Sequence, residues 1–109
     1  IATGFPYHDF ERKDTYLKIL GDFMESSHGV RRLGSAALDL AYVATGRFEG
    51  FYEYNLNAWD VAAGALVVQE AGGKVTDFSG KSDFVFGREI IASNDLIHKE
   101  IQGIIKKSW

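Results

Sequence analysis

Residues 53–64 read Glu-Tyr-Asn-Leu-Asn-Ala-Trp-Asp-Val-Ala-Ala-Gly, a stretch in which two carboxylates precede a run of small and apolar residues. The apolar run after Asp60 predicts a helix over 60–71, which ends at the Ala-Gly-Gly sequence of 71–73 because glycine favours the position after a helix C-terminus. Two carboxylates, Glu53 and Asp60, therefore lie just before and at the start of one helix. Such an Asp can cap the helix, or it can face a cleft and hold a metal ion.

Small side chains gather at the start of two predicted helices. Residues 62–65 of the helix after Asp60 are Ala, Ala, Gly and Ala, which are small enough to admit a ligand. A second helix is expected from its N-cap Ser35 to about Thr45. Residues 34–36 add little bulk there, so a polyol or phosphate could approach the free backbone N–H groups. Close packing of helices explains the same small residues.

The remaining pattern alternates strands with helices and predicts an α/β protein with helices on both faces of a sheet. The expected strands are 1–3, 30–33, 48–52, 74–78 and 89–93. The expected helices are 9–26, 35–45, 60–71 and a last one that starts at 94–95. No linker or repeat divides the chain, so residues 1–109 are expected to form a single domain.

Several side chains carry specific packing expectations. The first helix is expected to begin at the N-cap Asp9 and to place an apolar stripe on one face, formed by Phe10, Leu17, Leu20 and Met24 with Tyr16 and Phe23 beside it. Helices 35–45 and 60–71 are apolar nearly all round, which predicts burial between layers. Trp59 is expected to be a packing anchor. Arg31 and Arg32 could reach a phosphate, a neighbouring subunit or water.

Composition excludes some classes of protein. The net charge is −3, from 12 basic and 15 acidic residues with no dense basic stripe, so no nucleic-acid partner is expected. The absence of cysteine excludes disulfides and thiolate metal sites and is compatible with a cytoplasmic protein. No apolar run approaches the ~20 residues that span a bilayer, so no membrane partner is expected. The first residue is Ile1 rather than Met, and we expect a part of a longer chain.

Four blocks in order resemble the inositol monophosphatase family, in particular its bacterial-type inositol-1-monophosphatases. They are the Gly-Ser-Ala-Ala-Leu-Asp-Leu-Ala-Tyr-Val-Ala-Thr-Gly sequence of 34–46, Glu53, the Trp-Asp-Val-Ala-Ala-Gly sequence of 59–64, and the Glu-Ala-Gly-Gly sequence of 70–73. The third block matches the second signature of that family. The resemblance runs along nearly the whole chain but covers only the C-terminal part of the family's chain. It implies the layered α-β-α-β-α sugar-phosphatase fold, to which this chain would supply a C-terminal mixed sheet flanked by helices.

The resemblance also implies an activity, which is the Mg²⁺-dependent hydrolysis of a phosphate monoester by direct attack of water. Asp60 matches a metal ligand of the family, and Glu53 matches the carboxylate that contacts substrate hydroxyls. Gly34, Ser35 and Ala36 match the segment that lines the substrate site. Oxygen ligands without Cys or His clusters suit Mg²⁺. The expected partner is a small phosphate ester, inositol monophosphate above all, and the full-length protein is expected to be a homodimer.

One departure from the family leaves alternatives open. The first family signature, Asp-Pro-Ile/Leu-Asp-Gly-Thr, and a separate upstream metal-binding Glu are absent from this sequence. One Asp cannot hold the two or three Mg²⁺ ions of the family mechanism, so the chain alone is expected to be inactive. Related readings are a fructose-1,6-bisphosphatase, a histidinol-phosphate phosphatase or a nucleotide phosphatase. A non-catalytic module that has lost the metal site is the third alternative.

Overall fold

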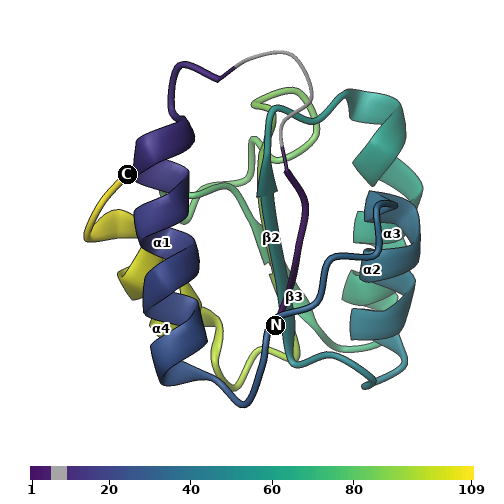
Figure 1. Ribbon diagram of the computed structural model, residues 1–109. Coiled ribbons are helices and arrows are strands. Elements are labelled where there is room, and N and C mark those ends of the chain that lie inside the picture. The colour runs from purple at the N-terminus through teal and green to yellow at the C-terminus, as the bar shows by residue number, and fades with distance from the viewer. Residues whose placement is uncertain (6–9) are drawn as a thin grey trace.

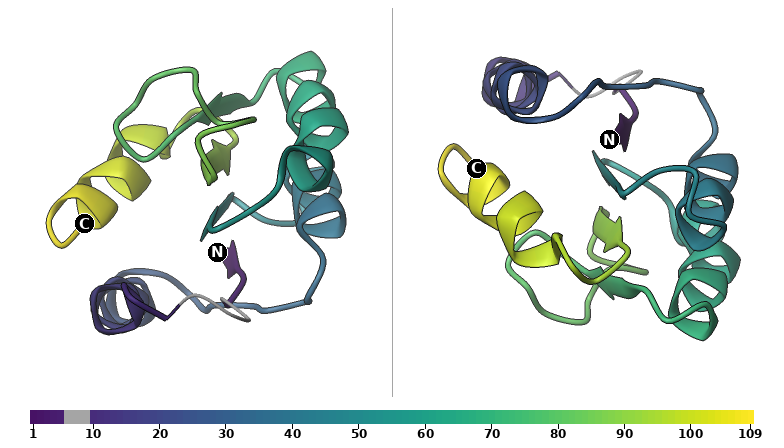
Figure 2. Two further views of the ribbon diagram at one scale, coloured as in Figure 1. Left: turned by 90° about the horizontal axis from the view of Figure 1, so that it is seen from above. Right: turned by 90° about the horizontal axis from the view of Figure 1, so that it is seen from below.

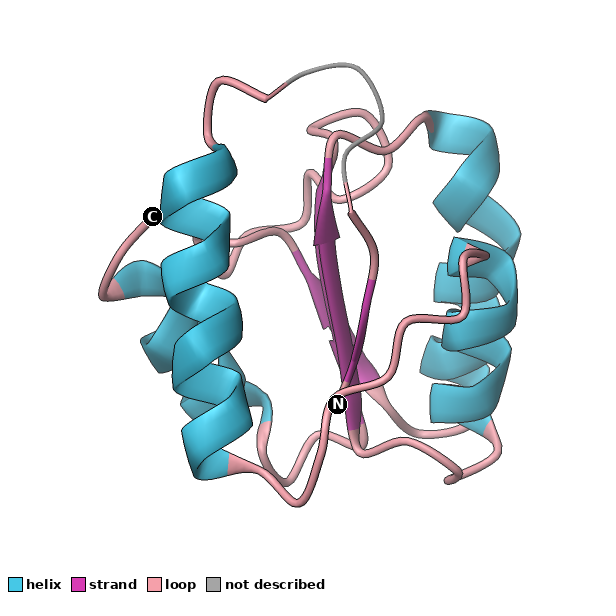
Figure 3. Cartoon of the chain, in the orientation of Figure 1, coloured by secondary structure: helices cyan, strands magenta, loops and turns pink. Residues whose placement is uncertain are grey.

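The computed structural model describes residues 1–5 and 10–109. In this part of the chain the strands are β1 (Ala2–Thr3), β2 (Gly50–Tyr54), β3 (Lys74–Thr76) and β4 (Glu89–Ser93). The helices are α1 (Lys13–Ser26), α2 (Ala36–Ala44), α3 (Ala58–Glu70) and α4 (His98–Lys106). Figure 1 colours the chain by residue number from the N-terminus to the C-terminus, and Figure 3 distinguishes its helices from its strands.

The strands form one mixed sheet in the order β1-β2-β4-β3. Strand β1 pairs with β2 in parallel, whereas β4 pairs antiparallel with both β2 and β3. Helices α1 and α4 cover one face of the sheet and α2 and α3 cover the other, as the two end-on views of Figure 2 show. The predicted fold class, a layered mixed sheet flanked by helices, is confirmed.

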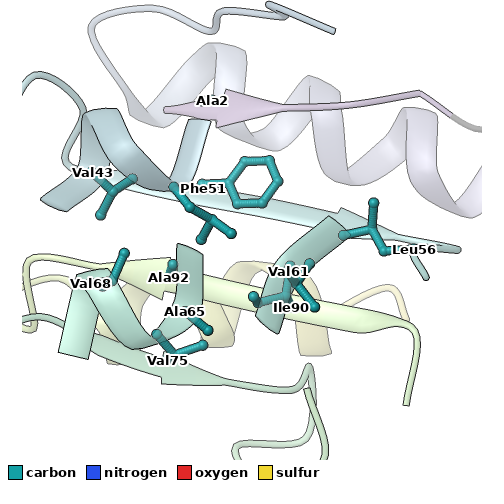
Figure 4. Packing of buried hydrophobic residues seen from close by; sticks show 11 residues of the cluster. Ala2, Val43, Phe51, Leu56, Val61, Ala65, Val68, Val75, Ile90 and Ala92 are labelled. Carbon is teal, nitrogen blue, oxygen red and sulfur yellow. The ribbon is translucent and has the colours of Figure 1, made fainter. Parts of the chain in front are cut away.

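Two apolar clusters fill the spaces between the sheet and its two helix layers. One joins β2 and β4 to α2 and α3 and includes Phe51, Val61 and Ile90 (Figure 4). The other includes Tyr52 and Ile91 and lies against α1 and α4. Because successive side chains of a strand alternate between faces, Glu53 shares the α2/α3 face with Phe51. This alternation brings the Glu53 carboxylate to the layer that contains Asp60.

The close approach of α2 and α3 depends on a glycine. A Cβ atom on Gly64 would lie 2.6 Å from Leu40 Cδ1 and 2.8 Å from Leu40 Cβ, which is closer than real contacts allow. Packing between the two helices therefore requires a very small residue at position 64. Small residues in this helix could admit a ligand or allow close helix packing. Gly64 allows close packing, because it contacts Leu40 of α2.

The first helix differs from its prediction in extent and in its buried face. Helix α1 begins at Lys13, and the predicted N-cap Asp9 lies outside the described residues. The side chains that face the sheet are Tyr16, Ile19 and Phe23. From the predicted stripe Leu20 is partly buried, but Phe10, Leu17 and Met24 are exposed, so that part of the prediction was wrong. The spacing of three and four residues from Tyr16 to Phe23 is an equally good helical stripe, turned away from the predicted one.

Other predicted boundaries are corrected at turns. Residues 30–33 form no strand; Arg31 makes only an isolated bridge to Ala2. Strand β3 ends at Thr76 because the Asp77 carboxylate turns the chain by accepting hydrogen bonds from the N–H groups of Ser79 (3.0 Å) and Lys81 (2.8 Å). Helix α4 begins at His98 rather than at 94–95, since Asp95 has a φ of 74° that a helix cannot contain.

Helices α2 and α3 keep an uncovered apolar side. Leu38, Leu66 and Val67 are exposed, so the prediction that these helices are buried all round was wrong for the described chain. Trp59 is 80% exposed, because it lies on the first turn of α3 away from the buried Val61, Ala65 and Val68. It is therefore not a packing anchor here. None of the helices in residues 1–5 and 10–109 has the length and apolar character needed to cross a membrane.

Candidate functional site

The five residues predicted to bind substrate or metal line one cavity of about 410 Å³. It opens where β2 ends and where α2 and α3 begin. The predicted residues are Gly34, Ser35, Ala36, Glu53 and Asp60. The structure adds Gly4, Phe5, Arg32, Ala37, Asp39, Tyr54, Asn55, Leu56, Asn57 and Trp59 to the lining. Segments far apart in the sequence thus meet at the N-termini of two helices, which favour anionic ligands.

The turn before α2 is built as expected from a glycine and a capping serine. Gly34 has a φ of +86°, a conformation that side chains with a Cβ rarely adopt. Ser35 is the N-cap, and its hydroxyl accepts a hydrogen bond from the N–H of Leu38 at 3.3 Å. The resulting turn presents the start of α2 to the cavity with little side-chain bulk in front of it.

Asp60 lies on the first turn of α3 and has a capping role. Its Oδ2 atom accepts a hydrogen bond from the backbone N–H of Asn57, the N-cap residue, at 2.9 Å. A carboxylate has a second oxygen and several lone pairs, so capping by Oδ2 does not exhaust its capacity to bind. The two roles considered for Asp60, helix cap and cleft ligand, are therefore compatible in one geometry.

Glu53 is buried, with 9% of its surface exposed. Its burial, followed by the negative charges of Asp39 and Asp60, raises the pKa of Glu53 to about 8, against a smaller opposing effect of Arg32. The carboxyl group occupies space beside the backbone of Gly4, where a Cβ atom would lie 1.8 Å from Glu53 Oε1. A neutral carboxyl both donates and accepts hydrogen bonds, as a hydroxyl does.

Asp39 is the residue of this site that sequence reasoning missed. It is only 1% exposed and lines the cavity from the first turn of α2. Burial raises its pKa to about 6, although the positive charge of Arg32 acts in the opposite direction. A signal was available, since Asp39 is the one charged residue in the apolar sequence of 36–44. A charge within such a helix is most often solvated, so the burial of Asp39 makes it a candidate for a functional role.

The neighbouring residues Arg31 and Arg32 line different cavities. Arg32 lines the cavity, with its guanidinium carbon 5.4 Å from the centre of the Phe5 ring. The Arg31 guanidinium donates to the carbonyl of Val30 at 3.0 Å and lies beside a second cavity instead. Residues 62–65, which were expected to leave room for a ligand, are not part of the site cavity. Ala65 is buried against the sheet layer, and Gly64 contacts α2 as described above.

The carboxylates of this chain could supply some, but not all, of the ligands of an oxygen-ligated metal site. Asp60, Asp39 and Glu53 supply only oxygen donors, which suits Mg²⁺ better than a soft metal. However, within the part of the chain that the structure describes, no three His, Cys, Asp or Glu side chains are grouped closely enough to hold a metal ion. A metal at Asp60 would need further ligands from elsewhere.

Known proteins resemble this chain in sequence and in fold. The sequence matches the model of the inositol monophosphatase family over residues 2–109. It is 52% identical over 105 residues to a Neisseria meningitidis serogroup B protein named putative Nus factor SuhB, covering 96% of this chain and 40% of that protein. It is 48% identical over 102 residues to an inositol-1-monophosphatase of Caulobacter vibrioides, covering 93% and 40%.

A solved structure of high similarity is the extragenic suppressor protein suhB from Bartonella henselae. Its TM-score is 0.92 at 48% identity, and the match covers 99% of this chain and 41% of that one. The chain thus spans about two fifths of the length of these relatives.

Proposed function

This chain belongs to the inositol monophosphatase family, and we propose that it forms the C-terminal part of a phosphatase that hydrolyses inositol monophosphate to inositol and phosphate. The observation that carries this proposal is the convergence of Glu53, Asp60 and residues 34–36 at one cavity. Residues 34–36 and the stretch from Glu53 to Asp60 are separate segments of the chain, and the fold brings them together at the start of two helices. The family assignment and the site geometry both support the proposal.

Each residue of the cavity is proposed to bind a different part of the substrate. Asp60 supplies one oxygen ligand to Mg²⁺, an ion that when bound activates water and neutralises phosphate charge. Residues 34–36 bring backbone N–H groups of α2 toward the ester. Glu53 exchanges hydrogen bonds with hydroxyl groups of the inositol ring, a role that its burial and its position opposite α2 favour.

We further propose that the missing metal ligands come from a part of the protein outside this chain. The single domain of residues 1–109 would then be the C-terminal part of a longer polypeptide, as the 40% coverage of the relatives favours. The exposed apolar side of α2 and α3, which includes Leu38, Leu66 and Val67, would pack against that part. A homodimeric, cytoplasmic protein is the expected form.

The test compares the full-length polypeptide with its Asp60→Asn variant, using myo-inositol 1-phosphate as substrate and Mg²⁺ as the metal. Loss of a metal ligand should lower kcat/KM by roughly a hundredfold or more. Asp14→Asn, a change to an exposed carboxylate on α1, is the matched control and should leave the rate unchanged. Equal activity of wild type and Asp60→Asn would refute the proposed role of Asp60.

The same assay separates the related functions. A panel of fructose 1,6-bisphosphate, histidinol phosphate and nucleotide phosphates tests the other phosphatases, since Asp60 would keep its role while the substrate differs. Inactivity of the full-length protein on every ester would favour the non-catalytic module.

A second candidate function comes from the Neisseria relative, whose name is that of a putative Nus factor. If that role applies here and does not depend on hydrolysis, it should survive Asp60→Asn.

A further inference from the structure

A buried carboxylate in the wall of the site cavity lacks a hydrogen-bonding partner. The Oδ1 atom of Asp39 is inaccessible and has none among the residues that the structure describes. Leaving such a group unsatisfied in the interior is costly, by about 1–3 kcal/mol or more for a charged group. A ligand that hydrogen-bonds to the group is one explanation for such a cost.

Asp39 is not needed as the N-terminal cap of α2, because Ser35 already fills that role. An acidic side chain in the first turn of a helix often serves as a cap, but the cap of α2 is Ser35, whose hydroxyl accepts from Leu38 N–H. The backbone N–H of Asp39 donates to the Ser35 carbonyl at 2.9 Å in the ordinary helical pattern. The dipole of α2 favours a negative charge at this position, but it satisfies no lone pair of Oδ1.

Asp39 and Glu53 reach the cavity from different elements. Asp39 comes from α2 and Glu53 from β2, and both side chains are buried while they line the same space. Arg32, which also lines the cavity, places a positive charge near both. Two buried oxygen groups that reach one cavity from different elements can engage hydroxyls at different positions of a ligand, whereas a single carboxyl group reaches only neighbouring hydroxyls.

We propose that Asp39 is a specificity-determining residue, which together with Glu53 binds hydroxyl groups on the alcohol side of the substrate and selects phosphate esters of polyols. This inference rests on the proposed phosphatase function. The chemical reason is that an ester without hydroxyl groups leaves both buried acids unpaired on binding. Sites built to hydrogen-bond a hydroxyl reject analogues that lack it far more strongly than apolar pockets reject a change in size.

The experiment measures kcat and KM of the full-length polypeptide and of two variants, Asp39→Asn and Asp39→Leu, on two esters. These are myo-inositol 1-phosphate, which has ring hydroxyls, and 4-nitrophenyl phosphate, which has none. Both variants should lower kcat/KM for the inositol ester by about tenfold or more, mainly through KM, and Asp39→Leu should lower it further. The value for 4-nitrophenyl phosphate should stay within about twofold of wild type, as should both values for Asp14→Asn.

The free energy of unfolding distinguishes a ligand-binding role of Asp39 from a structural one, because only loss of a structural role would lower it. If Oδ1 is unsatisfied for the sake of a ligand, Asp39→Asn should leave the unliganded protein as stable as wild type or more so at pH 8. A loss of stability in that variant, an equal fall for both esters, or no change for either would each overturn the inference. Inactivity of the wild type on both esters would instead refute the phosphatase proposal and this inference with it.

Discussion

The carboxyl group of Glu53 occupies the space beside Gly4 where a side chain would otherwise begin. A Cβ atom at residue 4 would lie 1.8 Å from Glu53 Oε1 and 2.2 Å from its Cδ. Gly4 follows β1 and Glu53 lies in the neighbouring strand β2, so the absence of a side chain on one strand's end makes room for the acid of the next. Gly4 thereby sets the position of Glu53 in the cavity.

Gly4→Ala should displace the Glu53 carboxyl group from its place in the site. We expect kcat/KM of the full-length polypeptide on myo-inositol 1-phosphate to fall by about tenfold or more, because misplaced binding groups are costly. Overpacking should also lower the free energy of unfolding of this chain by about 1–3 kcal/mol. Gly21→Ala is the control, since nothing lies within 4 Å of a Cβ atom there. It should stabilise α1 by about 0.5–1 kcal/mol and leave activity unchanged, whereas an unaffected Gly4→Ala would contradict the prediction.

Glu53→Gln should change how the stability of the 109-residue chain depends on pH. Burial and neighbouring negative charges raise the pKa of Glu53 from 4.5 to about 8, so the folded state holds this proton more tightly than the unfolded state. The stability that this gives is fully present below about pH 4.5 and is lost as the pH rises toward 8.

Glutamine has no proton to lose, so the variant should be more stable than wild type at pH 8 by roughly 3–5 kcal/mol. Urea unfolding at pH 5 and pH 8 measures this. The difference between variant and wild type should be small at pH 5. Parallel pH profiles for the two proteins would show that Glu53 keeps an ordinary pKa.

Local signals predicted the framework of the fold well. Strand β4 has its predicted bounds of 89–93, because Ile90 and Ile91 lie in a short run between turn residues and need no distant information. The Ser35 cap is likewise encoded by its own neighbours. Helix α1 was placed correctly along most of its length, but its buried face was not, since two helical stripes of similar quality share the same turns. Which stripe is buried depends on the sheet it meets.

In the candidate site, too, residues that belong to a local sequence motif were predicted, whereas properties that depend on the tertiary structure were not. Glu53 and Asp60 were found through a motif, and the fold brings them to one cavity. Asp39 lies within the 34–46 block but was assigned no role there, because a lone charge in a sequence does not show whether its side chain is buried. Trp59 was predicted to be a packing anchor but is exposed. A large aromatic side chain favours burial, but it is buried only where the chain supplies a surface to cover it.

Leu66→Gln tests whether the exposed side of α3 is covered in the longer protein. In the isolated chain Leu66 is exposed, so the substitution should change the free energy of unfolding by less than about 0.5 kcal/mol. In the full-length polypeptide it should cost about 2 kcal/mol or more, as burial of a polar group does. Val68→Ala, a truncation at a fully buried position, should destabilise both forms. An equally small effect of Leu66→Gln in both forms would mean that this surface stays exposed.

A network of hydrogen bonds through His98 joins α4 to two strands. The Thr76 hydroxyl donates its one hydrogen to the carbonyl of Asp77 at 2.8 Å, so it accepts from His98 Nε2, also at 2.8 Å. The neutral ring then has Nδ1 as an acceptor, and the Ser93 hydroxyl donates to it at 2.7 Å. The Ser93 oxygen in turn accepts from the N–H of Asp95 at 3.1 Å. This connectivity assigns the proton of the ring to Nε2.

Protonation of His98 should destabilise the fold, because a second ring N–H would face the hydrogen that Ser93 donates. Burial and the charge of Lys74 lower the pKa of His98 from 6.5, against the opposing charge of Asp95. The unfolded state therefore takes up the proton first, and the contribution of His98 is present above pH 6.5 and is lost as the pH falls below it.

His98→Gln should cost about 2–4 kcal/mol at pH 8 and should reduce the loss of stability between pH 6.5 and pH 5. The same change at the exposed His28 should alter stability by less than about 0.5 kcal/mol. Urea unfolding of the 109-residue chain at several pH values measures both effects. The neutral, Nε2-protonated assignment would be wrong if ¹⁵N NMR of the folded chain at pH 7 showed a proton on Nδ1 of His98.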